Sequence, residues 1–226
     1  MILSIQDIKN NLHTIKEELP SGVKLVAVSK FHPAELIMAA YESGQKIFGE
    51  SRVKEFLEKQ NLLPKDIEWH FIGHLQTNKV KQIIGLTSLI ESVDSERLLN
   101  LIDSESAKAG VMTKVLLQVH VAEEETKFGF YQEELRDYFK RRKFESLTHT
   151  HISGIMGMAT NTEDENRIKE DFRKIASLYD EIRNDKELGL RDFNMLSMGM
   201  SGDWKMAVEE GSNIVRIGSG IFGERK

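Results

Sequence analysis

The chain has 226 residues, of which 40% are apolar and 30% are charged, and only three are prolines. Such a composition is typical of a soluble globular protein and argues against disordered and fibrous classes. The length lies in the range over which α/β barrels form one domain. We therefore expect a single domain over residues 1–226, with two small domains as the alternative.

The net charge of −5 argues against a general nucleic-acid partner, because neutralising phosphates requires an excess of Lys and Arg. The basic run at 140–143 is better explained as a solvated helix end. The absence of cysteine excludes disulfides and thiolate chemistry. Because no apolar run resembles a signal peptide or a membrane span, we expect a cytoplasmic protein with no membrane partner.

The secondary structure is predicted from apolar spacing. Residues 5–19 carry isoleucine and leucine at helical intervals, which indicates an amphipathic N-terminal helix. Short apolar runs then alternate with helical patterns. The predicted strands cover 24–29, 46–49, 68–73, 88–92, 113–121, 150–155, 193–197 and 213–218. The predicted helices between them cover 33–42, 52–62, a segment from 77, 95–109, 132–140, 163–184 and 203–210.

This alternation predicts the fold class. Strands as apolar as these are typical of a parallel sheet buried on both faces, and eight strand–helix units suggest closure. We therefore predict an α/β protein with a single TIM-type (β/α)8 barrel and an additional N-terminal helix. An open doubly wound sheet is the alternative.

Candidate functional residues lie where predicted strands end, since barrels place their sites at that rim. Lys30 directly follows the first strand, where partial desolvation would let its amine attack a carbonyl and form an imine. An isolated strand-end lysine is more often simply solvated. Lys30 alone is therefore weak evidence.

Two glycine-containing loops near the C-terminus favour phosphate binding. Residues 218–223 match the spacing G-x-G-x-x-G, but the match lies three residues from the end of the sequence, without the helix and strand of a dinucleotide fold. Glycines after a last barrel strand let backbone N–H groups approach an anion. The preceding loop, 197–203, offers Ser201 as a hydroxyl donor or helix N-cap. Ordinary turns would explain either loop singly.

Several other polar and soft side chains have two interpretations. Arg216 shares a strand face with Gly218, and either a salt bridge or a ring nitrogen would satisfy it. His70 either lines a pocket or is a hydrogen-bonded structural histidine. His149 and His151 alternate on a strand but lack a close third ligand, so no metal site is predicted. Five methionines near two strand ends could pad a cofactor or fill the core; they are Met156, Met158, Met195, Met198 and Met200.

Several motifs in order resemble the YggS-like pyridoxal phosphate homeostasis protein family, which is related to the N-terminal barrel of alanine racemase. The resemblance spans essentially the whole chain. The motifs that carry it are VAVSK at 26–30, FGE at 48–50, WHFIGHLQTNK at 69–79, LSMGMS at 196–201, VRIG at 215–218 and IFG at 221–223.

The resemblance implies the cofactor pyridoxal 5′-phosphate (PLP), held as a Schiff base on Lys30. It implies that the phosphate rests on Ser201 and on the backbone around Gly218 and Ser219, and that Arg216 faces the pyridine nitrogen. An arginine cannot readily protonate that nitrogen, which weakens PLP as an electron sink. At Ser51 the family typically has asparagine, so the ring contact of that amide does not carry over directly; the shorter hydroxyl could reach through water.

Two functions follow from the resemblance: a PLP-binding homeostasis or carrier protein without efficient catalysis, and, as the alternative, a PLP-dependent amino-acid racemase. Racemisation needs a second acid/base on the opposite cofactor face, which the related enzyme takes from a tyrosine of a further C-terminal domain. The tyrosines here, Tyr41, Tyr131, Tyr138 and Tyr179, fall in or at predicted helices, and the sequence ends soon after the phosphate loop. We therefore expect the homeostasis function, with PLP-requiring apoenzymes as potential recipients and a monomer or weak dimer. A phosphate-sugar barrel enzyme without PLP is a third, weaker hypothesis.

Overall fold

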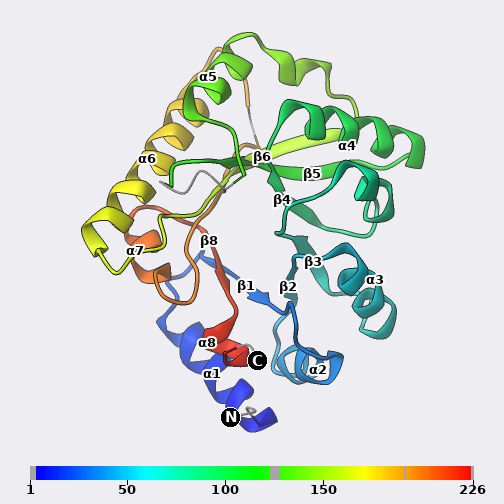
Figure 1. Cartoon of the computed structure of the whole chain (residues 1–226), viewed down its shortest axis with the longest axis vertical. Helices are drawn as coiled ribbons and strands as arrows, with labels where there is room; N and C mark the ends of the chain where they lie inside the picture. Colours follow the sequence, from blue (N-terminus) through cyan, green and yellow to red (C-terminus); the bar gives the residue numbers. More distant parts are fainter. Residues whose placement is uncertain (1–3, 123–127, 191, 225–226) are drawn as a thin grey trace.

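The strands form a closed parallel barrel in the computed structural model, which describes residues 4–122, 128–190 and 192–224 (Figure 1). Each strand pairs with the next in sequence, and β1 closes the barrel against β8. The predicted barrel is thereby confirmed, and the open sheet is excluded. The strands are β1 (Lys24–Val28), β2 (Ile47–Glu50), β3 (Glu68–Phe71), β4 (Leu89–Val93), β5 (Thr113–Val119), β6 (Thr150–Gly157), β7 (Met195–Ser197) and β8 (Ile214–Ile217).

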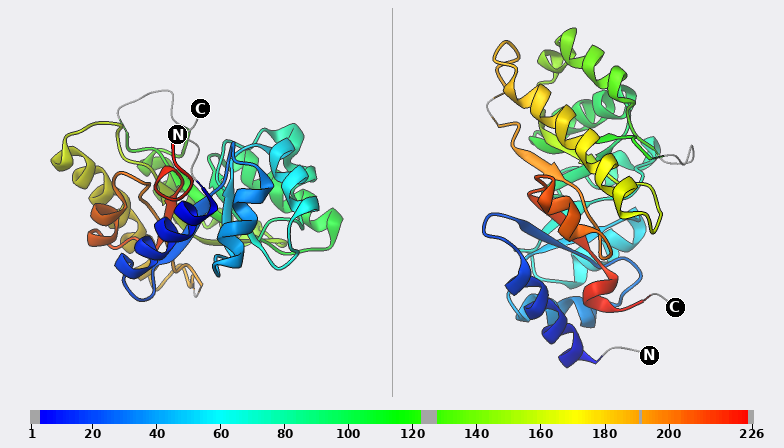
Figure 2. Two further views of the ribbon diagram at one scale, coloured as in Figure 1. Left: turned by 90° about the horizontal axis from the view of Figure 1, so that it is seen from below. Right: turned by 90° about the vertical axis from the view of Figure 1, so that its left-hand side faces the viewer.

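Helices surround the strands in all three ribbon views (Figures 1 and 2). They are α1 (Ile5–Glu18), α2 (Ala34–Glu42), α3 (Val53–Leu62), α4 (Glu96–Ala109), α5 (Gln132–Lys140), α6 (Glu165–Asn184), α7 (Trp204–Glu209) and α8 (Ser219–Phe222), with 3₁₀ helices η1 (Thr77–Gln82) and η2 (Lys143–Ser146). In the part of the chain that the structure describes, no helix combines the length and apolarity that a membrane crossing requires.

The helix predicted from residue 77 is a short 3₁₀ helix instead of a full α-helix. Its buried contacts come from Val80 and Ile83, which are three residues apart and therefore match the three-residue turn of a 3₁₀ helix. Gly85, with φ of 77°, lies three residues after Gln82, the last residue of the 3₁₀ helix, in a conformation that does not continue a right-handed helix.

The additional N-terminal helix is confirmed, and it supports the C-terminal end of the chain. A capping box starts α1, in which the Asp7 amide donates to Ser4 Oγ and the Ser4 amide donates to the Asp7 carboxylate. The buried face of α1 includes Ile8. α1 and α8 lie side by side (Figures 1 and 2), and Asn11 Nδ2 donates to the Ile221 carbonyl at 3.1 Å. The short helix α8 is therefore held from outside the barrel.

The barrel strands bury alternate side chains in two different layers. Most of the apolar core lies in one large cluster, which includes the residues of α1 and α6 that face the strands. A second, smaller cluster contains Val26, Leu89, Leu116, Met156 and Ile214. These five come from β1, β4, β5, β6 and β8, so they form an apolar layer inside the barrel. Because alternate residues of a strand share a face, the side chains two residues further along these strands also point into the barrel, nearer to its C-terminal rim.

Candidate functional site

Five of the six predicted cofactor residues line one cavity at the C-terminal ends of β1, β6 and β8. The cavity has a volume of about 280 Å³, near the lower end of the range of small-molecule sites. Apart from apolar residues and glycine, its walls carry an amine, a guanidinium and two hydroxyls. The lining consists of Val28, Lys30, Ile72, Met156, Met158, Met200, Ser201, Gly202, Arg216, Gly218 and Ser219. Three of the methionines considered from the sequence therefore face the cavity.

Lys30 is half-buried and lies just after the end of β1. Polar side chains hold the backbone on both sides of it. Lys59 Nζ, on α3, donates to the Ser29 carbonyl at 2.7 Å and to Glu50 Oε1 at 2.6 Å. On the other side of Lys30, the Phe31 amide donates to the carboxylate of Glu55. Phe31 has φ of 69°, an unusual conformation for a side chain of its size. The lysine therefore projects from a tightly specified turn.

The ion pair that supports this turn is almost entirely buried: Lys59 is 5% exposed and Glu50 is fully buried. Lys59 donates a third hydrogen bond to Glu55 Oε1 at 2.7 Å. Burial raises the pKa of the Glu50 carboxyl, although the charge of Lys59 and the Ser29 hydroxyl act to lower it. Lys59 was not predictable from the sequence, because a lysine on an amphipathic helix carries no signal that distinguishes it from a solvated one.

Backbone donors converge on Ser201 at the opposite side of the cavity. Ser201 Oγ accepts from the Gly218 and Gly220 amides, both at 3.2 Å. A Cβ at Gly218 would lie 3.3 Å from the backbone and side chain of Val28, so a side chain there would be tightly packed between β8 and β1. Amide and hydroxyl donors are the groups that bind phosphate oxygens, and a lysine and an arginine face the same space. The donor set therefore fits a phosphorylated carbonyl compound.

Gly199 sets the path of the loop that carries Ser201. Its φ is 92°, and a Cβ there would lie 2.7 Å from Ala207 Cβ and 2.8 Å from Trp204 Cα. We expect Gly199→Ala to lower the free energy of unfolding by about 1–3 kcal/mol through backbone strain and overpacking. Urea denaturation measures this change. Gly202→Ala is the matched control, since a Cβ at Gly202 meets nothing within 4 Å; equal losses in both variants would contradict the explanation.

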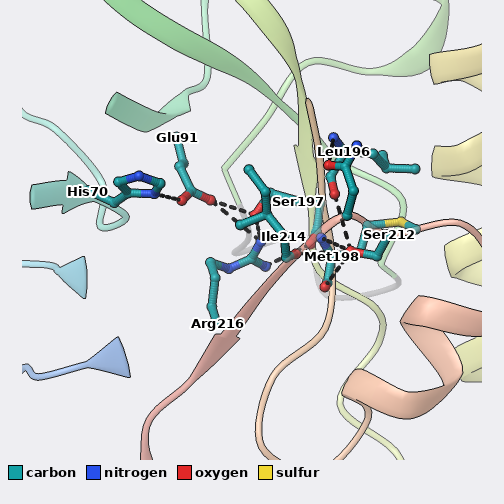
Figure 3. Close-up of polar contacts among 10 residues, drawn as sticks. His70, Glu91, Leu196, Ser197, Met198, Ser212, Ile214 and Arg216 are labelled. Atoms are coloured by element: carbon teal, nitrogen blue, oxygen red, sulfur yellow. Dashed lines mark hydrogen bonds and ion pairs between the residues drawn. The ribbon is translucent and has the colours of Figure 1, made fainter. Parts of the chain in front are cut away.

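Arg216 is 4% exposed, and it joins the cavity to a polar network inside the barrel (Figure 3). Its Nη1 donates to Ser197 Oγ at 2.5 Å, and its Nη2 donates to the Gly157 carbonyl at 2.9 Å. Glu91 Oε2 lies 3.7 Å from Nη1 and accepts from Ser197 Oγ at 2.6 Å. The sequence predicted either a salt bridge or a ring nitrogen as the partner of Arg216. The structure shows a salt bridge with Glu91, and Arg216 also lines the cavity.

Glu91 is the central anion of this network, and it was not among the residues predicted from the sequence. Burial would raise the pKa of Glu91, but His70, Arg216 and the Ser197 hydroxyl together lower it below its ordinary value. The carboxyl is therefore ionised and only accepts, so His70 Nδ1, at 2.6 Å from Glu91 Oε1, carries the hydrogen. His70 is thus hydrogen-bonded and structural, and it is not among the residues that line the cavity. The signal that could have found Glu91 was a charged residue in the middle of an apolar strand.

Ser51 is the sixth predicted residue, and it lies elsewhere at the rim. It lines a neighbouring cavity of about 590 Å³ together with Arg52, His74 and Lys79. A Cβ at Gly73 would lie 2.2 Å from the Ser51 carbonyl oxygen, so the loops after β2 and β3 pack directly on one another. A contact of Ser51 with the cofactor ring stays a prediction.

Comparison with known proteins identifies relatives of the chain. The family model of the alanine racemase N-terminal domain matches residues 3–226. The pyridoxal phosphate homeostasis protein of Aquifex aeolicus is 42% identical over 204 residues, covering 90% of this chain and 87% of that protein. The Homo sapiens protein of the same name is 38% identical over 213 residues, covering 89% of this chain and 76% of that protein.

Two solved structures define the fold relationship. PipY of Synechococcus elongatus, solved with PLP bound, superposes with a TM-score of 0.87 at 34% identity, covering 96% of this chain and all of that one. An alanine racemase of Clostridium difficile has a TM-score of 0.75 at 16% identity, and the match spans 97% of this chain but 56% of the enzyme. At that identity the likeness concerns the fold alone. The chain therefore belongs to the alanine racemase N-terminal domain family and, within it, to the pyridoxal phosphate homeostasis proteins.

Proposed function

We propose that this protein binds PLP covalently through Lys30 and acts in PLP homeostasis without efficient catalysis. The observation that carries the proposal is the convergence of Lys30, Ser201, Gly218, Ser219 and Arg216 on one cavity. An amine that can condense with an aldehyde faces a set of phosphate-binding donors across that space. The names of the relatives and the PLP-bound relative PipY support the same ligand.

Each group in the cavity has a distinct task in this proposal. Lys30 Nζ attacks the aldehyde carbon, a C=N bond forms, and the aldehyde oxygen leaves as water. The Ser201 hydroxyl, whose oxygen accepts from the Gly218 amide, donates to the phosphate together with the Ser219 N–H, and the backbone at Gly218 lines the same place. Arg216 donates a hydrogen bond to the ring nitrogen, since a guanidinium stays protonated and cannot readily deliver a proton. PLP bound in this way is a weak electron sink, which supports retention of the cofactor over carbanion chemistry.

The alternative, an amino-acid racemase, requires an acid/base on each face of the bound substrate. Among the described residues that line the cavity, Lys30 and Arg216 are the only ones with titratable side chains. The four tyrosines lie in the described part of the chain, and none of them lines the cavity. Turnover of a panel of amino acids discriminates the two functions: robust racemisation that is abolished by Lys30→Ala would favour the enzyme.

Borohydride reduction followed by peptide mass spectrometry tests the attachment point. We expect the protein incubated with PLP to carry one reduced phosphopyridoxyl group, on the peptide that contains Lys30. Lys59 is an internal control, because its amine is buried and already donates three hydrogen bonds. A reduced protein without label on Lys30 would show that the proposal is wrong. PLP transfer to a PLP-requiring apoenzyme, followed by its regained activity, tests the proposed recipients.

A further inference from the structure

The polar network beneath the cavity consists of His70, Glu91, Ser197 and Arg216, and we refer to these four residues as the Glu91 cluster. They come from four different strands, β3, β4, β7 and β8, and their side chains point towards one another across the barrel interior (Figure 3). Glu91 and Ser197 are fully buried, while His70 and Arg216 are 5% and 4% exposed. Water therefore contributes little to holding these groups in place.

The direction of each hydrogen bond around Ser197 is determined by its single hydrogen. Its hydroxyl donates to Glu91 Oε2 at 2.6 Å and accepts from Arg216 Nη1 at 2.5 Å. The other carboxylate oxygen, Glu91 Oε1, is held by His70. Ser197 thus bridges an anion and a cation that lie 3.7 Å apart. The serine hydroxyl therefore lies between the guanidinium and the carboxylate, which form only a long ion pair.

These contacts specify the orientation of the whole guanidinium. Two of its five N–H groups are used, by Ser197 and by the Gly157 carbonyl, on two different terminal nitrogens. Because the group is planar and rigid, holding both terminal nitrogens determines where the other N–H groups point. The other three N–H groups take no part in these two bonds, and Arg216 lines the cavity. The Glu91 cluster therefore does more than neutralise a buried charge.

We propose that Ser197 and Glu91 are positioning residues, which aim the remaining Arg216 donors at the ring nitrogen of the cofactor and so set its hydrogen bonding. This inference rests on the proposed binding of PLP in the cavity. Without the Ser197 hydroxyl, Nη1 is expected to close the 3.7 Å separation and bond directly to Glu91. The guanidinium would tilt towards β4, and its contact with the ring nitrogen would weaken.

Ser197→Ala tests the inference while leaving every charge in place. The holoprotein is prepared with PLP labelled with ¹⁵N at the ring nitrogen, and the chemical shift of that nitrogen is measured by NMR. We expect the resonance to move towards the position of a pyridine nitrogen without a hydrogen-bond donor. We also expect the Kd for PLP to rise about three- to tenfold, as for the loss of one hydrogen bond.

Ser212→Ala is the matched control. Ser212 is a buried serine between β7 and β8, whose hydroxyl contacts the carbonyls of Leu196, Met198 and Ile214 but does not contact Arg216 (Figure 3). Its loss should lower stability and leave the ring-nitrogen resonance unchanged. Equal movement in both serine variants, or an unmoved resonance in Ser197→Ala, would overturn the positioning role.

Two further variants separate geometry from charge and from misfolding. Ser197→Thr keeps the bridging hydroxyl and should hold the resonance near its wild-type position, so it provides the readout if the alanine variant fails to fold.

Glu91→Gln removes the anion, and we expect the resonance to move as in Ser197→Ala. A move towards a protonated pyridine would instead mean that Glu91 only weakens the charge of Arg216, which contradicts positioning. Failure of the wild-type protein to bind PLP at all would refute the proposed function and is distinct from these outcomes.

Discussion

Replacing Lys30 with alanine should abolish the covalent adduct with PLP and raise the Kd by at least about a hundredfold, at 1.4 kcal/mol for each factor of ten. The alanine lacks the amine that forms the C=N bond, while Ser201, Gly218 and Ser219 still line the cavity. We therefore expect weak, non-covalent binding to persist. The visible absorption of the imine and equilibrium dialysis with PLP measure the two effects.

The control for this variant is a lysine that flanks the phosphate loop without facing the cavity. Lys205, at the start of α7, forms an ion pair with Glu18 at 2.7 Å and is largely exposed. Lys205→Ala should leave the absorption and the affinity unchanged. An undiminished visible band in Lys30→Ala would mean that another amine binds the cofactor, and the assignment of Lys30 would be wrong.

Lys59→Met should lower the free energy of unfolding by about 3–5 kcal/mol near neutral pH, because it leaves the Glu50 carboxylate buried without its cation. One oxygen of that carboxylate, Oε2, already lacks a hydrogen-bond partner. The loss also removes the donor that holds the Ser29 carbonyl, directly before Lys30. We therefore expect weaker PLP binding beside the loss of stability. Guanidinium denaturation and PLP titration measure the two.

The pH dependence of Lys59→Met follows from the raised pKa of Glu50. Burial favours the protonated acid in the folded protein, so the folded state binds the proton more readily than the unfolded state. Stability therefore decreases as the pH rises from the unfolded pKa through the folded pKa. Without Lys59 this window extends to higher pH, so the variant should be less destabilised at about pH 5 than at about pH 7.

Glu50→Gln in the same background identifies the cause of the instability. The neutral amide removes the unpaired charge, so the double variant Lys59→Met, Glu50→Gln should recover part of the stability lost in Lys59→Met. A double variant as unstable near neutral pH as Lys59→Met alone would indicate lost packing of the lysine stem in place of an unpaired carboxylate.

The apolar periodicity of the sequence determined the secondary structure closely. The eight short apolar runs became eight strands, and β1 and β2 lie within one residue of their predicted bounds. Most differences are at ends, as in β7, which begins at Met195 instead of residue 193. The segment from 77 changed type, because its buried residues follow a three-residue spacing. The apolar pattern of a local segment therefore predicts whether it forms a helix or a strand wherever burial of one or both of its faces determines that choice.

The general location of the site was also predictable, because a parallel barrel brings the C-terminal ends of all its strands to one rim. Lys30 follows the first strand, and Gly218 follows the last. The closure of β1 on β8 places them together, with Ala27 opposite Ile217. The cavity therefore joins residues from the two ends of the sequence by a rule of topology.

The polar partners of these residues were decided by tertiary structure alone. Glu91 and Ser197 are 106 residues apart in sequence, and they meet because alternate side chains of β4 and β7 share the barrel interior. Lys59 reaches Glu50 and Ser29 because α3 packs beside β2. A charged residue in a sequence is normally solvated, and only the packed barrel shows which charges lose their water and require a partner. The sequence thus determined which groups occupy the rim, whereas the packing determined how they are held and oriented.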